Sequence, residues 1–144
     1  DVRGGIIHNY PLVKIGTQYW MRDNLEASSY VGGEALPRLD AVTANVVGYL
    51  QSATEHYFYT ANVVLSNKIL PIHWSIPDWK DWNILKDYLN GEASLLKSGT
   101  WLPLKAGEQV QPATNLSGFN GIPVGMYVGA FQKLTSKHLC IYEA

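Results

Sequence analysis

The chain has 144 residues, of which 47% are hydrophobic and 16% are charged. That length suits one domain with a packed core, and the composition excludes an intrinsically disordered chain. Eleven basic and twelve acidic residues give a net charge of −1. Lys and Arg nowhere form the run that phosphate neutralisation requires, so nucleic acid is excluded as an expected partner.

The chain begins at Asp1, without Met and without a charged-then-apolar leader. We therefore expect that a signal was removed or that a larger protein was cut here. Residues 12–15 and 18–21 are rich in β-branched and aromatic residues and are joined by Gly16 and Thr17. This pattern predicts a β-hairpin with a tight turn.

The secondary structure of the following segment is less clear from the sequence. Residues 30–39 contain a Gly-Gly pair and a proline, which predict a loop. Residues 41–59 carry apolar side chains near helical spacing, but a glycine and the β-branched content weaken that pattern, so helix and loop both stay open. The apolar runs at 57–59 and 63–65 fit either a strand or a helix.

Residues 75–91 predict an amphipathic helix. Asp78 is placed to cap the first free amides, and Asp81 stands three residues later, where a capping-box acid reaches back. The pattern places four apolar residues on one core-facing side and Gly91 at the left-handed stop. The four residues are Trp82, Leu85, Tyr88 and Leu89.

Gly, Pro, Asn, Ser and Thr dominate residues 99–129, which predicts extended loops with strands only around 122–128 and at 139–142. The longest stretch without a charged residue, 109–132, is interrupted by glycines and prolines, which excludes a membrane helix. No repeat, charge block or linker occurs. We therefore predict one α+β domain over residues 1–144, with small twisted antiparallel sheets, one or two helices and long loops.

Three blocks of the sequence occur in a characteristic order. They are residues 13–25 (VKIGTQYWMRDNL), then 74–78 (WSIPD) with Asp81, Trp82 and 85–89 (LKDYL), then 115–119 (NLSGF) with Pro123, Gly125 and Tyr127. Their order and spacing resemble the Fibrobacter succinogenes major paralogous domain over most of the chain. The resemblance implies a variant of the C-type-lectin-like fold, the scaffold of formylglycine-generating enzymes, in surface lipoproteins and cell-envelope proteins of gut and rumen bacteria.

Two departures from the family pattern bear on chemistry. Leu70 and Pro71 stand where the family usually has Cys-Pro, so Cys140 at the family's C-terminal cysteine position is left as a single thiol without the usual disulfide. The tryptophan- and serine-rich segment that usually precedes the last strand is shortened here. The chain therefore lacks much of the family's long-loop region.

No metal or cofactor is expected from the remaining polar residues. The calcium-dependent sugar tripeptides of this scaffold are absent, and one cysteine cannot reproduce the copper-binding pair of formylglycine-generating enzymes. His138 lies two residues before Cys140 on a predicted strand, where packing is the favoured role. The histidines have no metal-site spacing, and Asp78 and Asp81 are explained as helix caps rather than as an acid/base pair. The four histidines are His8, His56, His73 and His138.

Aromatic residues are the candidate ligand contacts, because sugar recognition commonly uses an exposed ring beside polar groups. Trp20 and Trp82 are assigned to the core by their positions in the hairpin and on the helix face. Trp79 follows the N-cap away from that face and is the leading candidate. The residues that extend the candidate surface are Trp101, Tyr57, Tyr59 and Tyr127.

We therefore expect a non-catalytic binding or adhesion module at a bacterial cell surface, outer-membrane-associated and possessing no transmembrane segment of its own. A glycan and a surface protein both stay open as its ligand. The first alternative is an enzyme related to formylglycine-generating proteins, against which the solitary cysteine stands. The second is a purely structural module that caps a longer fimbrial or envelope protein.

Overall fold

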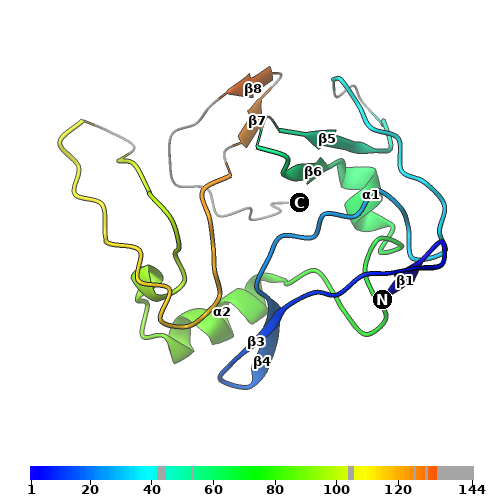
Figure 1. Ribbon diagram of the computed structural model, residues 1–144. Helices are drawn as coiled ribbons and strands as arrows, with labels where there is room; N and C mark the ends of the chain where they lie inside the picture. The colour runs from blue at the N-terminus through cyan, green and yellow to red at the C-terminus, as the bar shows by residue number, and fades with distance from the viewer. Residues whose placement is uncertain (42–44, 53, 104–105, 125, 129, 133–144) are drawn as a thin grey trace. The chain divides into compact units, whose positions relative to one another are not determined.

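The computed structural model describes residues 1–41, 45–52, 54–103, 106–124, 126–128 and 130–132 (Figure 1). Over these residues the protein is α+β, with four antiparallel strand pairs and two α-helices. The chain forms two compact units. Of the described residues, unit 1 comprises 1–9 and those within 24–76, and unit 2 comprises 10–23 and those within 77–132. The single-domain assignment stays a prediction.

Unit 1 contains two short hairpins and one short helix. Strands β1 (Val2–Arg3) and β2 (Ile6–Ile7) pair antiparallel across a Gly-Gly turn. Strand β5 (Tyr49–Gln51) pairs with β6 (Tyr57–Tyr59), and helix α1 (Ala61–Leu65) follows directly. The prediction of helix or loop for residues 41–59 is wrong at 49–51, which form a strand, and the apolar run at 57–59 is the strand that pairs with it.

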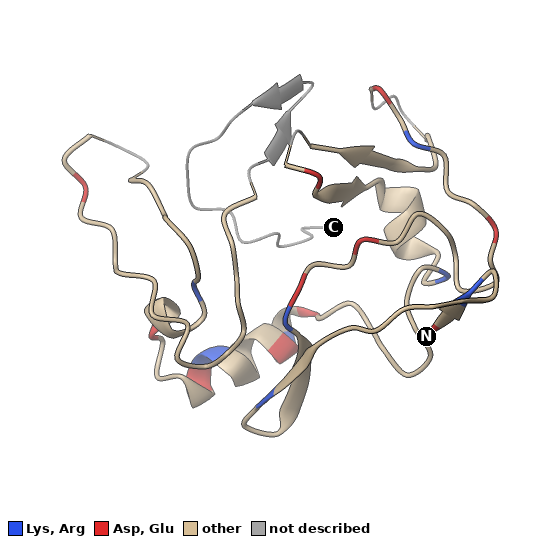
Figure 2. Ribbon diagram, in the orientation of Figure 1, with Lys and Arg blue, Asp and Glu red and all other residues tan. Residues whose placement is uncertain are grey.

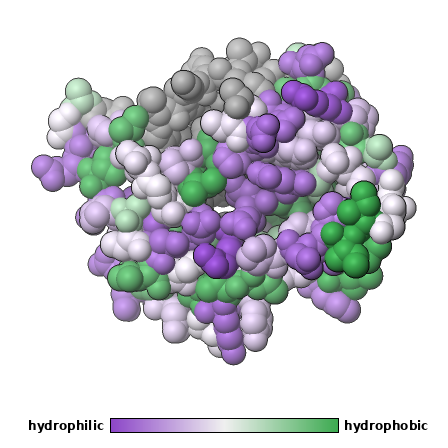
Figure 3. Space-filling view, viewed as in Figure 1, coloured by the Kyte–Doolittle hydropathy of each residue, from purple (hydrophilic) through white to green (hydrophobic). Residues whose placement is uncertain are grey.

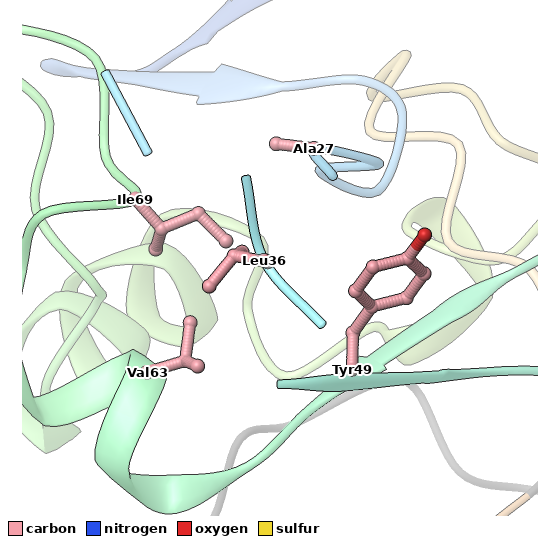
Figure 4. Close-up of a cluster of buried hydrophobic side chains, with 5 residues drawn as sticks. All are labelled: Ala27, Leu36, Tyr49, Val63 and Ile69. Atoms are coloured by element: carbon pink, nitrogen blue, oxygen red, sulfur yellow. The ribbon is translucent and has the colours of Figure 1, made fainter. Parts of the chain in front are cut away.

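The β5–β6 hairpin packs one face on the core of unit 1. The register Tyr49↔Tyr59 and Gln51↔Tyr57 places three tyrosines on the same face of the hairpin. Tyr49 is one of the five buried residues of this core, and Tyr57 and Tyr59 pack against it; the five are Ala27, Leu36, Tyr49, Val63 and Ile69 (Figure 4). Val63, in α1, has no exposed surface at all. The apolar run at 63–65 is thus a helix because one of its residues closes this core.

A buried charge ties the amino-terminal hairpin to the rest of unit 1. Arg3 is 2% exposed, and its guanidinium donates to three acceptors. These are the Asp1 carboxylate at 2.7 Å, the Ser29 carbonyl at 2.6 Å and the Ile69 carbonyl at 2.7 Å. Because every acceptor is within hydrogen-bonding distance, the buried Arg3 guanidinium is compensated by a counter-charge and by hydrogen bonds.

Unit 2 begins with the predicted hairpin. Strands β3 (Leu12–Ile15) and β4 (Gln18–Met21) pair antiparallel with Ile15 opposite Gln18, which leaves Gly16 and Thr17 as a two-residue loop. Gly16 has a φ of +60°, while Thr17 is not in the left-handed region, as a type II′ turn requires. The hairpin prediction is confirmed.

Helix α2 (Trp79–Tyr88) is the longest helix of the described residues. It ends in a Schellman motif, in which the Gly91 amide donates to the Lys86 carbonyl at 2.9 Å and the Asn90 amide donates to the Asp87 carbonyl at 3.1 Å. Asn90 takes the left-handed position at φ 52°, and Gly91 follows at φ +75°. The predicted stop at Gly91 is therefore one residue late, because asparagine also tolerates this conformation.

The remainder of unit 2 is mostly loop. A short 3₁₀ helix, η1 (Ala93–Leu95), follows α2, and strands β7 (Met126–Val128) and β8 (Ala130–Gln132) pair antiparallel. Residues 99–124 contain no strand among those described, so the predicted strand around 122–128 begins only at Met126. The strand predicted at 139–142, with His138 and Cys140, lies outside the described residues.

Candidate binding surface on helix α2

The first turn of α2 is held by reciprocal hydrogen bonds. The Asp78 carboxylate accepts from the Lys80 amide at 2.7 Å and from the Asp81 amide at 3.1 Å. The Asp81 carboxylate accepts in return from the Asp78 amide at 2.9 Å. This capping box is the one that the sequence predicts, and it satisfies amides that an uncapped helix would leave open. The backbone that carries the next residue, Trp79, is therefore well fixed.

Trp79 is the exposed tryptophan of this turn, with 69% of its surface accessible. The Lys80 ammonium lies 5.8 Å from its ring centroid, within the range of a cation–π contact. Such contacts are weak at exposed sites, so most of the indole faces solvent on a rigid backbone. Figure 2 shows that charges of both signs occur along the helix that carries it.

The opposite side of α2 explains why Trp79 stays outside. Leu85 and Leu89 are buried at 1% and 8% exposure in the core of unit 2, with Ile15 and Trp20 from the hairpin. Trp82 joins them, with its ring centroid 4.9 Å from that of Trp20. The spacing of three residues places Trp79 on the side next to Trp82, but its 69% exposure shows that its ring lies at the edge of this cluster and not over it. The core is complete without its ring.

The hairpin also contacts α2 through a polar side chain. The Gln18 side-chain amide donates to the Asp81 carbonyl at 3.1 Å. Phe119, from the loop region, packs against the Trp20 and Trp82 rings at centroid distances of 5.5 Å and 6.0 Å. Two segments of unit 2, the hairpin and the loop that carries Phe119, thus hold the helix that presents Trp79.

Trp101 occupies an interior position in unit 2. It is 8% exposed, its indole Nε1 donates to the Ser98 carbonyl at 2.8 Å, and the Lys97 ammonium lies 5.4 Å from its ring centroid. This burial contradicts the expectation that Trp101 extends an exposed aromatic surface. The physical reason is that its N–H finds a local carbonyl three residues earlier, which lets the ring turn inward.

Tyr57 and Tyr59 lie in unit 1 and support its core. The Tyr59 hydroxyl accepts from the Ala27 amide at 2.6 Å and donates toward the carbonyls of Leu25 and Ala27. Tyr57 stacks on Tyr49 with ring centroids 4.5 Å apart. Burial first, then the charge and hydrogen bond of Tyr49, raise the pKa of Tyr57 above its ordinary value of 10.0. Both rings are half-buried and engaged within the unit.

Tyr127 lies in β7, and its side chain is outside the described part of the structure. The candidate residues are therefore not gathered into one cluster by anything that the structure describes. Tyr57 and Tyr59 belong to unit 1, whereas Trp79 and Trp101 belong to unit 2 and differ in exposure. Trp79 alone of these four presents a largely open ring.

Two further exposed aromatics of unit 2 were not among the predicted contacts. Tyr19 is 62% exposed, and the alternation of strand side chains could have found it, because its neighbour Trp20 faces the core. Tyr88 is also 62% exposed, which corrects its assignment to the core face of the helix. Its ring lies beside the hairpin turn, where a Cβ on Gly16 would be 2.8 Å from Tyr88 Cδ2.

One pair of titratable side chains lies on the surface of unit 1. His56 Nδ1 lies 3.1 Å from Glu26 Oε1 on the surface of unit 1. Within the described residues, no group of three or more His, Cys, Asp or Glu side chains is arranged to hold a metal ion. The carboxylates of Asp78 and Asp81 accept the backbone hydrogen bonds of the helix cap. Cys140 and His138 are not part of the described structure.

Separate apolar side chains are also exposed on unit 1. The β1–β2 hairpin presents Val2, Ile6 and Ile7 at 56%, 65% and 72% exposure. A strongly hydrophobic patch is visible at the right of Figure 3. No polar side chain of this hairpin accompanies them, because Arg3 points into the unit. Across the described part of the chain, no helix combines the length and apolar character that a bilayer crossing needs.

Comparison with known proteins adds one finding. The model of the Fibrobacter succinogenes major domain family matches residues 13–140, which include β4, α2 and β3 except for its first residue. No curated protein and no solved structure matches the chain. The matched range covers the hairpin, the capped helix and the Asn115 loop whose motifs resemble that family. The chain belongs to the Fibrobacter succinogenes major domain family.

Proposed function

We propose that this protein is a non-catalytic binding module of a bacterial cell surface and that it contacts its ligand through Trp79. The single observation that carries the proposal is the 69% exposure of the Trp79 indole on a capped, well-packed helix. Tryptophan is enriched among the residues that dominate binding energy, and this one is held open to solvent on a fixed backbone. A C-type-lectin-like fold and an outer-membrane-associated location are parts of the same proposal.

The rigidity of the helix supports a binding role for Trp79. A ring held by a fixed backbone loses little conformational entropy when a ligand covers it. The capping box fixes the backbone on either side of Trp79, and the Trp20, Trp82 and Phe119 rings fix the opposite side of the helix. The site is thus organised before a ligand arrives.

The non-catalytic part of the proposal rests on the chemistry of the side chains. A nucleophile needs a base within hydrogen-bonding reach, and an acid/base pair needs two carboxyl groups that are not otherwise engaged. Asp78 and Asp81 accept backbone hydrogen bonds, and Cys140 has no second cysteine in the chain. A thiol-dependent turnover that disappears in Cys140→Ser would support the enzyme alternative instead.

Binding to glycans and to intact bacterial envelopes tests the proposal. We expect the wild-type protein to bind and Trp79→Ala to lose binding while its thermal unfolding stays unchanged, since the ring is not in the core. Tyr19→Ala is the matched control, because Tyr19 is similarly exposed but lies in the hairpin. Equal binding by wild type and Trp79→Ala refutes the role of Trp79. A protein that binds no envelope component favours the structural capping module.

A separate experiment tests the location. An antibody against this domain should label intact cells of the source bacterium, and the domain should fractionate with the envelope. Recovery of the protein exclusively from the soluble interior of the cells would contradict the proposed location, whatever the outcome of the binding assays.

A further inference from the structure

We propose that the ligand of this surface is an uncharged oligosaccharide that lies along one flank of α2, over Trp79, Asn83 and Lys86. These three residues, the α2 stripe, are spaced by four and three residues and therefore stand above one another on the same side of the helix. The inference rests on the proposed function, because it assigns the chemistry of the ligand and its path from the same tryptophan.

The α2 stripe carries polar groups with nothing to bind in the described structure. Asn83 is half-buried and Lys86 is exposed. The described hydrogen bonds and ion pairs of the helix involve Asp78, Asp81 and the main chain, and none uses the side chain of Asn83 or Lys86. Core residues occupy the neighbouring side, as Leu85 and Leu89 show. The stripe is thus a row of free donors and acceptors beside an open indole.

This combination of groups matches a sugar chain. The apolar face of a pyranose ring can cover an indole, while its hydroxyl groups both donate and accept hydrogen bonds. An asparagine side chain offers one acceptor and two donors, and a lysine ammonium offers three donors. From Trp79 to Lys86 the helix rises about 10 Å. A ligand that contacts all three residues is therefore longer than one sugar ring.

The charges of α2 favour an uncharged ligand over an anionic one. Three aspartates and two lysines alternate in sequence from Asp78 to Asp87, and both signs are visible along the helix in Figure 2. A polyanion would gain from Lys80 and Lys86 but would meet the carboxylates of Asp81 and Asp87 nearby. Since complementary surfaces place opposite signs together, a helix of mixed sign fits a neutral partner best.

Calorimetric titration with neutral xylo- and cello-oligosaccharides of increasing length tests this inference, with polygalacturonate as the anionic comparison. We expect affinity to rise with chain length until the ligand spans the α2 stripe. Trp79→Ala should weaken binding about tenfold or more, and Asn83→Ala and Lys86→Ala about three- to tenfold each. Ile84→Ala is the control, because Ile84 is 50% exposed on another flank of the helix.

Nuclear magnetic resonance separates direct contact from a structural effect. The side-chain amide signals of Asn83 should shift on addition of the oligosaccharide, whereas the backbone spectrum of free Asn83→Ala should match that of the wild type outside α2. Binding that is unaffected by Asn83→Ala and Lys86→Ala overturns the stripe. Tighter binding of polygalacturonate, or no binding of either neutral series, overturns the ligand class. A different result refutes the proposed function itself: Trp79→Ala that binds the bacterial envelope as well as the wild type does.

Discussion

Replacement of Gly16 is predicted to lower the free energy of unfolding for two separate reasons, and one set of variants can measure each of them. Its φ of +60° is a conformation that a residue with a Cβ adopts only at a cost of roughly 1–2 kcal/mol. A Cβ at Gly16 would also lie 2.8 Å from Cδ2, 3.1 Å from Cγ and 3.2 Å from Cε2 of Tyr88. These atoms belong to the body of the ring, so the ring itself must move.

Overpacking of this kind costs about 1–3 kcal/mol. The sum of the conformational cost and the overpacking cost predicts that Gly16→Ala lowers the free energy of unfolding by about 2–5 kcal/mol. Gly91→Ala is the matched control, because Gly91 has a φ of +75° in the same unit and a Cβ there would meet nothing within 4 Å. We expect this variant to lose only the conformational part, roughly 1–2 kcal/mol.

Urea denaturation followed by circular dichroism measures these differences. Tyr88→Ala should cost little by itself, since Tyr88 is 62% exposed, and should recover the overpacking part when combined with Gly16→Ala. The coupling energy of this double-mutant cycle isolates the contact from the backbone term. Equal losses for Gly16→Ala and Gly91→Ala, together with a coupling energy near zero, would refute the contact between the turn and the helix.

Three further predictions concern the cap, the buried charge and pH. Asp78→Ala should lower the free energy of unfolding by about 1 kcal/mol because it removes two hydrogen bonds from the first turn of α2, and the exposed control Asp87→Ala should be near neutral in the same denaturation assay. Arg3→Met should cost about 3–5 kcal/mol because it removes the buried guanidinium that donates to the Asp1 carboxylate and the Ile69 carbonyl; a melting temperature like that of wild type would contradict this. The raised pKa of Tyr57 means that its neutral form is favoured in the folded unit, so its contribution is complete below pH 10.0 and is lost as pH rises through the folded pKa. The difference in unfolding free energy between wild type and Tyr57→Phe should therefore change above pH 10.0 and stay constant below it, and a difference that is flat through alkaline pH would show that burial leaves this phenol unperturbed.

The elements that the sequence predicts correctly are those whose causes lie within a few residues. A two-residue glycine turn between β-branched and aromatic runs is enough to specify the β3–β4 hairpin. An aspartate, a second acid three residues later and apolar residues at helical spacing are enough to specify α2. Because neighbouring residues alone specify these two elements, the structure expected from the local pattern agrees with the folded structure.

The elements that the sequence does not predict are those whose formation depends on pairing with distant segments. Residues 49–51 and 57–59 have too little periodicity to identify them as strands, and they become strands by pairing with each other over a core that Val63 and Ile69 complete. Three-residue strands carry little periodic signal, whereas tertiary packing decides their structure. The sequence pattern does not predict the amino-terminal hairpin for the same reason, since its anchor is the Arg3 contact with carbonyls of residues 29 and 69.

The sequence alone determined the hairpin turn, the helix with its cap and the family to which the chain belongs, because each depends on residue identities at short and fixed spacings. Tertiary structure decided which aromatic rings face solvent. Trp79 and Trp101 have the same side chain, yet one is 69% exposed and the other 8% exposed. Exposure depends on what other segments place around a ring, as Ser98 and Lys97 do for Trp101, and local sequence spacing does not encode those neighbours.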